Sequence, residues 1–366
     1  MTLTFELNDE LLTPVLQRHF NNPSARTQTA ELVALKPGLG NPTSLGVYRV
    51  SGTASIDGAP QDFSLVVKHL ANGLPLMDTS DPTHWNHWKR EIEFFGSPLV
   101  QLIPNKIAYP KYLGQTKLQD GTALFWNSDL GDLTKSNWTW SKCLEAAELV
   151  AELNTISADV AEPYEWLNRT QWHGWLEMRD EYFTPYEQQL RDTALSNPVS
   201  AAAYQNWGPF LNQQPQLSQI VWDARQSFVH GDFNLNNLVP LAGEGSGLIA
   251  LDWQLCGVAG IGSELAAIFN TAVEFGVIDG SVEQFNQLAQ VYVTRFNQLN
   301  PSQQITVDEV RLVAAALGYV ISNGVTFFFM REKAGDPATP ERLQLAVETF
   351  SKPLVMTYST VLHELL

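Results

Sequence analysis

Residues 228–253 read FVHGDFNLNNLVPLAGEGSGLIALDW, and this stretch decides the fold. Its short β-type segments are separated by a polar loop and by the glycine-rich turn 243–247, a pattern that predicts strand, loop, strand, turn and strand. Asp232 and Asn237 stand five positions apart in the loop, and Asp252 follows Asp232 by twenty positions, at the end of the last strand. Taken alone, His-Gly-Asp is most often an ordinary turn, because Gly and Asp tolerate unusual backbone angles.

The spacing of these polar residues matches the requirements of phosphoryl transfer from a nucleotide. One carboxylate must orient the acceptor hydroxyl and take its proton, while a second carboxylate and an amide oxygen hold Mg²⁺ against the phosphates. His230, Asp232 and Asn237 satisfy the protein-kinase pattern H-x-D-x-x-x-x-N, and Asp252 stands where that pattern requires the magnesium-binding Asp.

The same residues resemble the aminoglycoside phosphotransferase and choline kinase-like family of small-molecule kinases. That family has HGD…N in place of HRD…N and carries its second Asp in an IDW or IDF context, and this chain has HGDFNLNN and ALDWQ. The resemblance, which covers about residues 30 to 270, implies ATP and Mg²⁺ as cofactors, Asp232 as the catalytic base, and Asn237 and Asp252 as magnesium ligands. His230 is then a structural residue of the loop.

Element patterns divide the chain into two parts. The first 127 residues are rich in β-type segments such as 47–56, 63–70 and 122–126, with one helical pattern at 85–100. Helical patterns dominate from about Leu133, most clearly at 141–156, 175–190, 282–299 and 308–325. We therefore expect an α+β, bilobal protein kinase-like fold, with a small β-rich N-lobe (1–127, nucleotide binding), a large mainly helical C-lobe (128–366, catalysis and acceptor binding) and a cleft between them.

A kinase also needs a strand Lys that pairs with the phosphates and with a helical Glu. Lys68 ends the apolar run 63–67, although a Lys can equally protect an edge strand. Two glutamates could be its partner. The apolar residues of the helical pattern at 85–100 form a stripe along the helix, and Glu91 lies about 40° outside one edge of this stripe, whereas Glu93 lies about 80° outside the other edge. We expect Glu91 to pair with Lys68 and Glu93 to face water, the alternative being that Glu91 is only a solvated charge. The stripe consists of Trp85, Trp88, Ile92 and Phe95.

Two further segments are candidates for nucleotide contact. The loop 38–46 precedes a strand and offers Gly40 and Ser44 as phosphate neighbours, but it matches neither G-x-G-x-x-G nor a Walker A motif and is equally compatible with a plain turn. The hinge is expected after residue 126, where the chain reads Ser128-Asp129-Leu130 and relatives commonly carry Glu-Asp-Leu.

The chain departs from its relatives at two positions in the helical half. Glu264 precedes Leu-Ala where relatives carry Asp, so its bond to the catalytic loop is expected to be rearranged by the extra methylene. Asn154 stands where relatives carry His, and either side chain can hydrogen-bond a buried backbone group, which makes its expected role structural.

Composition excludes several classes of protein. The 22 Lys and Arg against 39 Asp and Glu give a net charge of −17, which argues against nucleic acid as a partner. The two cysteines cannot form a disulfide framework or a four-ligand zinc site. Residues 312–330 are uncharged over nearly a membrane-spanning length, but their Gly, Ser, Asn and Thr content favours a buried helix. With no signal-peptide pattern at the start, we expect a cytoplasmic protein without a membrane partner.

The acceptor is not decided by the sequence. An aminoglycoside, an amino sugar and choline-like compounds all remain open, as does the oligomeric state. Five tryptophans and three acidic residues could form a wall for an ammonium group, but packing is the stronger explanation. They are Trp138, Trp140, Trp166, Trp172, Trp175, Glu177, Asp180 and Glu181. The rival function is a catalytically silent kinase-fold protein that only binds ligands; a protein kinase lacks support because no DFG or A-P-E motif is present.

Overall fold

The computed structural model describes residues 5–35, 43–73, 78–131, 137–169, 213, 215–243, 245–332 and 352–366, with the backbone alone for 323–332. The chain forms two compact units: the first contains Met1–Gln101 and Tyr109–Leu133, and the second contains Leu102–Ala108 and Thr134–Leu366.

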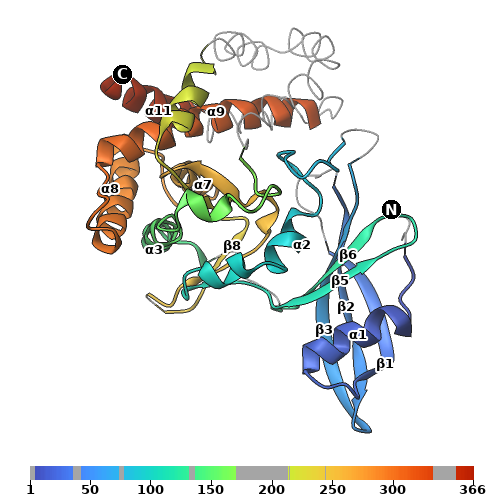
Figure 1. The fold of residues 1–366 in the computed structure, drawn as a ribbon. Helices are drawn as coiled ribbons and strands as arrows, with labels where there is room; N and C mark the ends of the chain where they lie inside the picture. The colour runs from blue at the N-terminus through green and yellow to red at the C-terminus, as the bar shows by residue number, and fades with distance from the viewer. Residues whose placement is uncertain are drawn as a thin grey trace. The chain divides into compact units, whose positions relative to one another are not determined.

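The first unit is built on one antiparallel sheet in the order β1-β2-β3-β6-β5. The strands are β1 (Arg26–Leu35), β2 (Ser44–Ile56), β3 (Ala59–Leu70), β5 (Tyr112–Lys117) and β6 (Ala123–Ser128). Helix α1 (Asp9–Phe20) packs against this sheet (Figure 1). Its Leu12, Val15 and Leu16 are buried in one core with Leu65, Val67 and Trp126 of the sheet, so burial of alternate strand residues fixes the face that β3 presents.

The helix expected at residues 85–100 is much shorter in the structure. Only α2 (Arg90–Phe95) is α-helical, followed by the 3₁₀ turn η1 (Pro98–Leu102). The buried Arg90 guanidinium donates hydrogen bonds to the carbonyl oxygens of His84 and Trp85, both at 2.6 Å. Just before them, the Asp81 carboxylate accepts a hydrogen bond from the Thr83 N–H at 2.8 Å. These side-chain bonds stabilise a turn in place of a first helical turn.

Helices dominate the second unit (Figure 1). They are α3 (Trp140–Leu153), α7 (Glu264–Glu274), α8 (Val282–Leu299), α9 (Val307–Glu332) and α11 (Lys352–Leu365). The helices expected at 141–156, 282–299 and 308–325 are confirmed; the one expected at 175–190 lies outside the described residues. Gly318 allows α9 to approach α11 closely, because a Cβ there would lie 2.2 Å from the Tyr358 ring.

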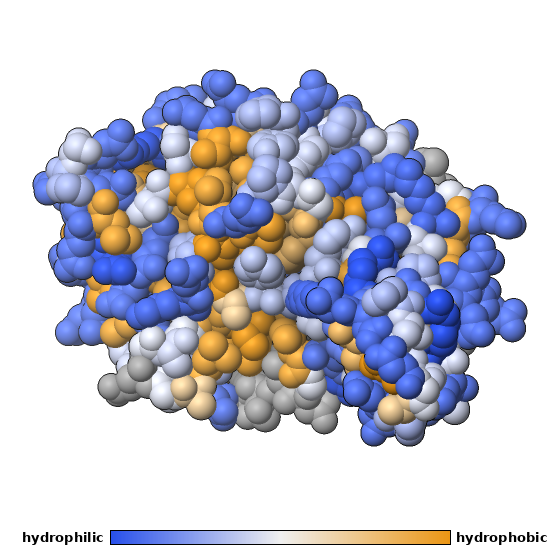
Figure 2. Space-filling view, turned by 60° about the horizontal axis from the view of Figure 1, so that its bottom comes forward, coloured by the Kyte–Doolittle hydropathy of each residue, from blue (hydrophilic) through white to orange (hydrophobic). Residues whose placement is uncertain are grey.

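Helix α9 contains the uncharged stretch 312–330. Its described side chains up to Ser322 are largely buried, including Val313, Leu317 and Val320. None of the described helices combines the length and the apolar character that crossing a membrane requires. On the face drawn in Figure 2, hydrophilic residues surround groups of hydrophobic ones.

Short strands in the second unit support the stretch that decides the fold. Strand β7 (Gln226–Val229) pairs with β10 (Gly257–Gly260), and the three-stranded sheet β4-β9-β8 joins Ile107–Ala108, Leu248–Ala250 and Leu238–Pro240. The expected order of strand, loop, strand, glycine-rich turn and strand is therefore confirmed. The polar loop follows β7, and Asp252 follows β9.

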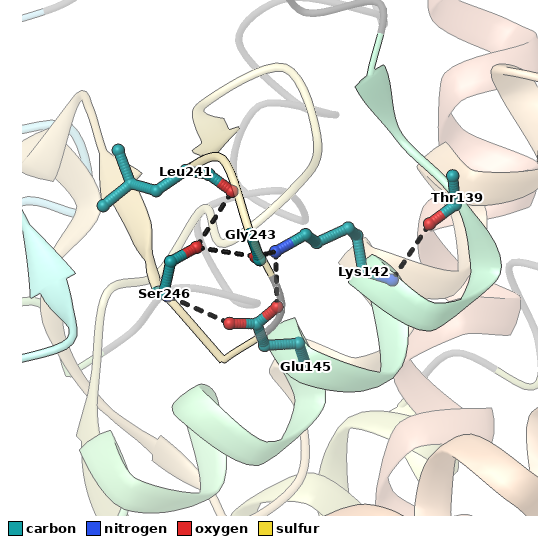
Figure 3. A network of polar contacts seen from close by, with 7 residues as sticks. Thr139, Lys142, Glu145, Leu241, Gly243 and Ser246 are labelled. Atoms are coloured by element: carbon teal, nitrogen blue, oxygen red, sulfur yellow. Dashed lines mark hydrogen bonds and ion pairs between the residues drawn. The ribbon is translucent and has the colours of Figure 1, made fainter.

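The glycine-rich turn between β8 and β9 is fastened to α3 (Figure 3). Lys142 donates to the Gly243 carbonyl at 2.6 Å and pairs with Glu145 at 2.7 Å, while Glu145 accepts from the Gly247 N–H at 2.9 Å. Ser246 closes the turn on the carbonyls of Leu241 and Gly243. Because β8 begins just after Asn237 and β9 ends just before Asp252, this anchor helps to hold both polar residues in place.

Candidate active site

The polar loop is held by its apolar residues and by His230. Phe233 and Leu235 are fully buried, and the Leu235 N–H donates to Thr271 Oγ1 of α7 at 3.0 Å. The buried His230 ring accepts a hydrogen bond from the Asp232 N–H at Nδ1, 3.2 Å away, which leaves Nε2 as the donor to the Leu251 carbonyl at 3.1 Å. One neutral imidazole thus joins the segment carrying Asp232 to the segment carrying Asp252.

Asp232 is held through both of its carboxylate oxygens. Asn234 Nδ2 donates to Oδ1 and Asn237 Nδ2 donates to Oδ2, each at 2.6 Å. Burial and the nearby charge of Asp252 raise the pKa of Asp232 to about 6, although the two amide hydrogen bonds oppose the rise. At neutral pH the carboxylate is ionised, oriented and basic enough to accept a proton.

Asp252 has an unusual backbone conformation. Its φ of 62° and ψ of 69° place it in the left-handed region, which non-glycine residues seldom occupy and which is enriched at functional sites. The next residue, Trp253, is fully buried with its ring 4.4 Å from the His230 ring, and the Leu251 N–H donates to the Asn237 carbonyl at 2.8 Å. These contacts bring Asp232, Asn237 and Asp252 into one cluster.

The chemistry of this cluster fits a magnesium ion. Because the Asn237 amide nitrogen donates a hydrogen bond to Asp232, the Asn237 Oδ1 atom is the one that can coordinate the ion. Asp252 provides a carboxylate as a second ligand. Burial is the larger cause of the raised pKa of Asp232, and a cation would offset the smaller contribution, which comes from the Asp252 charge. Among the described residues no three His, Cys, Asp or Glu side chains gather as a metal site, and Mg²⁺ commonly takes only one or two carboxylates together with waters and phosphate oxygens.

Glu264 and Asn154 lie directly behind the loop. Glu264 Oε1 accepts from the Gly231 N–H at 3.0 Å, and Oε2 accepts from Asn154 Nδ2 at 3.3 Å. Asn154 Nδ2 also donates to the Phe228 carbonyl at 2.9 Å, so its expected structural role is confirmed. Burial raises the pKa of Glu264 to about 7, with the Asp232 charge acting in the same direction and hydrogen bonds opposing it.

The first unit contains the other expected charged pair. Lys68 on β3 lies 2.7 Å from Glu91 Oε2 on α2, with both side chains largely buried. Glu93, expected to face water, is half-buried and lies 3.3 Å from His87 Nε2. The structure therefore pairs Lys68 with Glu91, while the part that this pair plays toward a nucleotide stays a prediction.

The expected nucleotide loop and hinge are only partly described. Gly40 lies outside the described residues, and Ser44 is the half-buried first residue of β2, paired with Leu70. In the hinge, Asp129 accepts from Ser64 Oγ on β3 and forms an ion pair with Arg49 of β2 at 2.8 Å. Burial raises the pKa of Asp129, but the bonds from Ser64, Gly131 and Arg49 outweigh this and hold it below its usual range.

The tryptophan-rich segment is also only partly described. Trp138 is buried, and Trp140 Nε1 donates to Gln287 Oε1 of α8 at 2.9 Å, so these two side chains pack the helical unit. Trp166 is half-buried beside Tyr164. The remaining members of the wall considered above, Trp172, Trp175, Glu177, Asp180 and Glu181, lie outside the described residues.

Residues 137–295 match the model of the phosphotransferase enzyme family. The family resemblance predicted from the sequence is confirmed. The matched region contains the whole cluster of Asp232, Asn237, Asp252 and Glu264, and the expected class of enzyme, a small-molecule phosphotransferase, is supported by this match. No curated protein matches the chain.

Solved structures with the same fold include two small-molecule kinases. A spectinomycin phosphotransferase in complex with ADP and spectinomycin aligns with a TM-score of 0.52 and 12% identity over 99% of this chain and all of that one. An amicoumacin kinase in complex with AMP-PNP and Ca²⁺ aligns with a TM-score of 0.52 and 13% identity over 89% and 90%. These likenesses confirm the α+β, protein kinase-like fold.

Several residues that support the cluster were not predicted from the sequence. Asn234 lies within the quoted motif and its Asn-rich setting was a usable signal, since short amides often hydrogen-bond a residue two positions away. Tyr292 donates to Asn154 Oδ1 at 2.7 Å from a helix 138 positions later. In the first unit, Arg49 and Asp129 form a comparable pair from distant parts of the sequence. Such long-range partners leave no mark in local spacing.

Proposed function

We propose that this protein is an ATP-dependent phosphotransferase that moves the γ-phosphate of Mg-ATP to a hydroxyl group of a small molecule, with Asp232 as general base. The observation that carries the proposal is the state of Asp232. Its carboxylate is fixed by two amide donors and its pKa lies near 6, so it is both oriented and basic at neutral pH.

The roles of the surrounding residues follow from the same geometry. Asp232 accepts the proton of the acceptor hydroxyl as the hydroxyl oxygen bonds to the γ-phosphorus and the bond from that phosphorus to the oxygen of the leaving ADP breaks. Asn234 and Asn237 keep the Asp232 oxygens oriented. Asn237 Oδ1 and Asp252 would hold Mg²⁺, which when bound neutralises charge on the phosphates. Lys68, fixed by Glu91, binds the α/β-phosphates in this proposal. Gly40 and Ser44 stay proposed phosphate neighbours.

For the acceptor, we propose an aminoglycoside, amino sugar or choline-like compound. The neighbouring structures contain spectinomycin and kanamycin as bound small molecules, which supports a hydroxylated, nitrogen-containing acceptor. The net charge of −17 favours such a cationic acceptor over an anionic one. The alternative is a catalytically silent ligand-binding protein, but Lys68, Asp232 and Asp252, which such proteins typically lose, are all present.

The test is magnesium-dependent ADP release across a panel of aminoglycosides, amino sugars, choline and ethanolamine. We expect at least one acceptor to stimulate release, and ³¹P NMR of the product to show a phosphate ester. Silence across the panel together with loss of Mg-ATP binding would refute the proposal. Silence with normal Mg-ATP binding, extended to neutral sugars and alcohols without a response, would favour the silent binding protein.

A further inference from the structure

A buried chain of hydrogen bonds leads from α8 to the loop that contains Asp232. The Tyr292 hydroxyl lies 2.7 Å from Asn154 Oδ1, and Asn154 Nδ2 reaches Glu264 Oε2 at 3.3 Å and the Phe228 carbonyl at 2.9 Å. Glu264 Oε1 in turn accepts from the Gly231 N–H at 3.0 Å. Tyr292, Asn154 and Glu264 are all buried, so water cannot replace a missing partner at low cost.

The direction of each bond is fixed. Burial raises the pKa of Tyr292 well above its ordinary value, so the phenol stays protonated and donates. Asn154 must then turn its oxygen toward Tyr292 and its nitrogen toward Glu264 and Phe228. Without the hydroxyl, Asn154 Oδ1 loses a buried donor, and the amide is then held by the bonds of its nitrogen to Glu264 and to the Phe228 carbonyl.

We propose that Tyr292 is a positioning residue for phosphoryl transfer, acting through Asn154 and Glu264 on the backbone that precedes Asp232. The chain ends on backbone amides of His230 and Gly231, and Gly231, which has a φ of 87°, directly precedes the candidate base. A shift of that peptide moves the Asp232 carboxylate relative to its amide donors. The effect on turnover rests on the proposed function, whereas the effect on the Gly231 amide does not.

The chain provides a matched control in Tyr358. Its hydroxyl is as deeply buried as that of Tyr292 and bonds an Asn side chain in the same way, donating to Asn270 Oδ1 of α7 at 2.5 Å. Among the described residues Asn270 makes no hydrogen bond to Gly231 or Glu264, and it lies six positions after Glu264 in α7. Tyr358→Phe therefore removes a comparable hydroxyl without reaching Gly231. In Tyr292→Phe the ring keeps its stacking on Phe296, so the variant is expected to fold.

The first measurement compares kcat and KM for the two Tyr→Phe variants. For Tyr292→Phe we expect kcat to fall about five- to tenfold, the equivalent of one hydrogen bond, with KM for the nucleotide unchanged. Tyr358→Phe should lose a similar amount of thermal stability while keeping kcat. In an Asn154→Ala background, Tyr292→Phe should have no further effect on kcat. Equal kcat in both Tyr→Phe variants, or additive effects of the Asn154 and Tyr292 changes, would overturn the proposal.

The second measurement needs no activity. Hydrogen exchange of the Gly231 amide should speed up about five- to tenfold in Tyr292→Phe and stay unchanged in Tyr358→Phe. An unchanged Gly231 rate in Tyr292→Phe would refute the positioning role even if the wild type is active. Faster Gly231 exchange in Tyr292→Phe, together with a wild type that transfers no phosphate, would support the hydrogen-bond chain and refute the proposed function.

Discussion

Replacing Glu264 by glutamine removes the ionisable group behind the candidate base and exchanges one of its two acceptor oxygens, the one that faces Asn154 Nδ2, for an amide nitrogen. Glutamine keeps a carbonyl oxygen that can accept from the Gly231 N–H, and it has almost the same volume. In the wild type, burial raises the pKa of Glu264 from its ordinary value of 4.5 to about 7. The folded protein therefore holds a proton on Glu264 at pH values where the unfolded chain has released it.

The sign of the effect follows from that difference. Because the folded pKa lies above the unfolded one, this group stabilises the fold fully below about pH 4.5, and the contribution is lost as the pH rises through 7. A gap of about 2.5 pKa units corresponds to about 3 kcal/mol, most of which disappears between pH 5 and pH 8. The glutamine side chain of Glu264→Gln has no proton to lose in this pH range. The free energy of unfolding of this variant should therefore lack the part of the decline with rising pH that Glu264 causes.

Urea unfolding of both proteins at several pH values between 5 and 8 measures the effect. We expect the free energy of unfolding to decline by about 2–3 kcal/mol more in the wild type than in Glu264→Gln across this range. Glu283→Gln, which removes an exposed carboxylate at the start of α8, serves as the control and should follow the wild type. Parallel pH curves for wild type and Glu264→Gln would refute the reasoning.

Three further changes test separate parts of the site. Asp252→Ala should weaken magnesium-dependent nucleotide binding by at least tenfold in calorimetry, because a carboxylate ligand is lost; unchanged affinity would remove Asp252 from the metal site. Lys68→Ala should lower kcat by about 10²-fold or more, because a phosphate contact is lost and Glu91 is left buried without its cation, and a normal rate would contradict the assigned role. Gly231→Ala should cost roughly 1–3 kcal/mol in urea unfolding, because its φ of 87° disfavours a side chain, and a neutral effect would exclude backbone strain there.

The sequence predicts the elements around the candidate base well. Strand, loop and turn residues from 228 to 253 are local signals, and so is the 3.6-residue period that places α8 at Val282–Leu299. The helix near residue 90 was overestimated, because the pattern cannot show that Arg90 will bond the carbonyls of His84 and Trp85. A tertiary contact overrides the local helical period there.

Side-chain partners are predictable only where few candidates compete. Lys68 had two possible glutamates, and the helical stripe distinguished them by angle. Tyr292 and Asn154 could not be matched in this way, since their contact depends on how α3 and α8 pack. The raised pKa of Asp232 likewise depends on the burial of its carboxylate and on how near the Asp252 charge lies. The positions of residues in the sequence show neither of these.

The role of Asp232 as the general base of phosphoryl transfer is tested most directly by the variant Asp232→Asn. The measurement compares kcat and Mg-ATP affinity of wild type and variant with the acceptor that the panel identifies. We predict that kcat falls by about 10²–10⁴-fold, the usual contribution of a general base, while Mg-ATP affinity stays nearly the same. A variant that turns over at the wild-type rate would contradict the account, and so would one that loses nucleotide binding together with turnover.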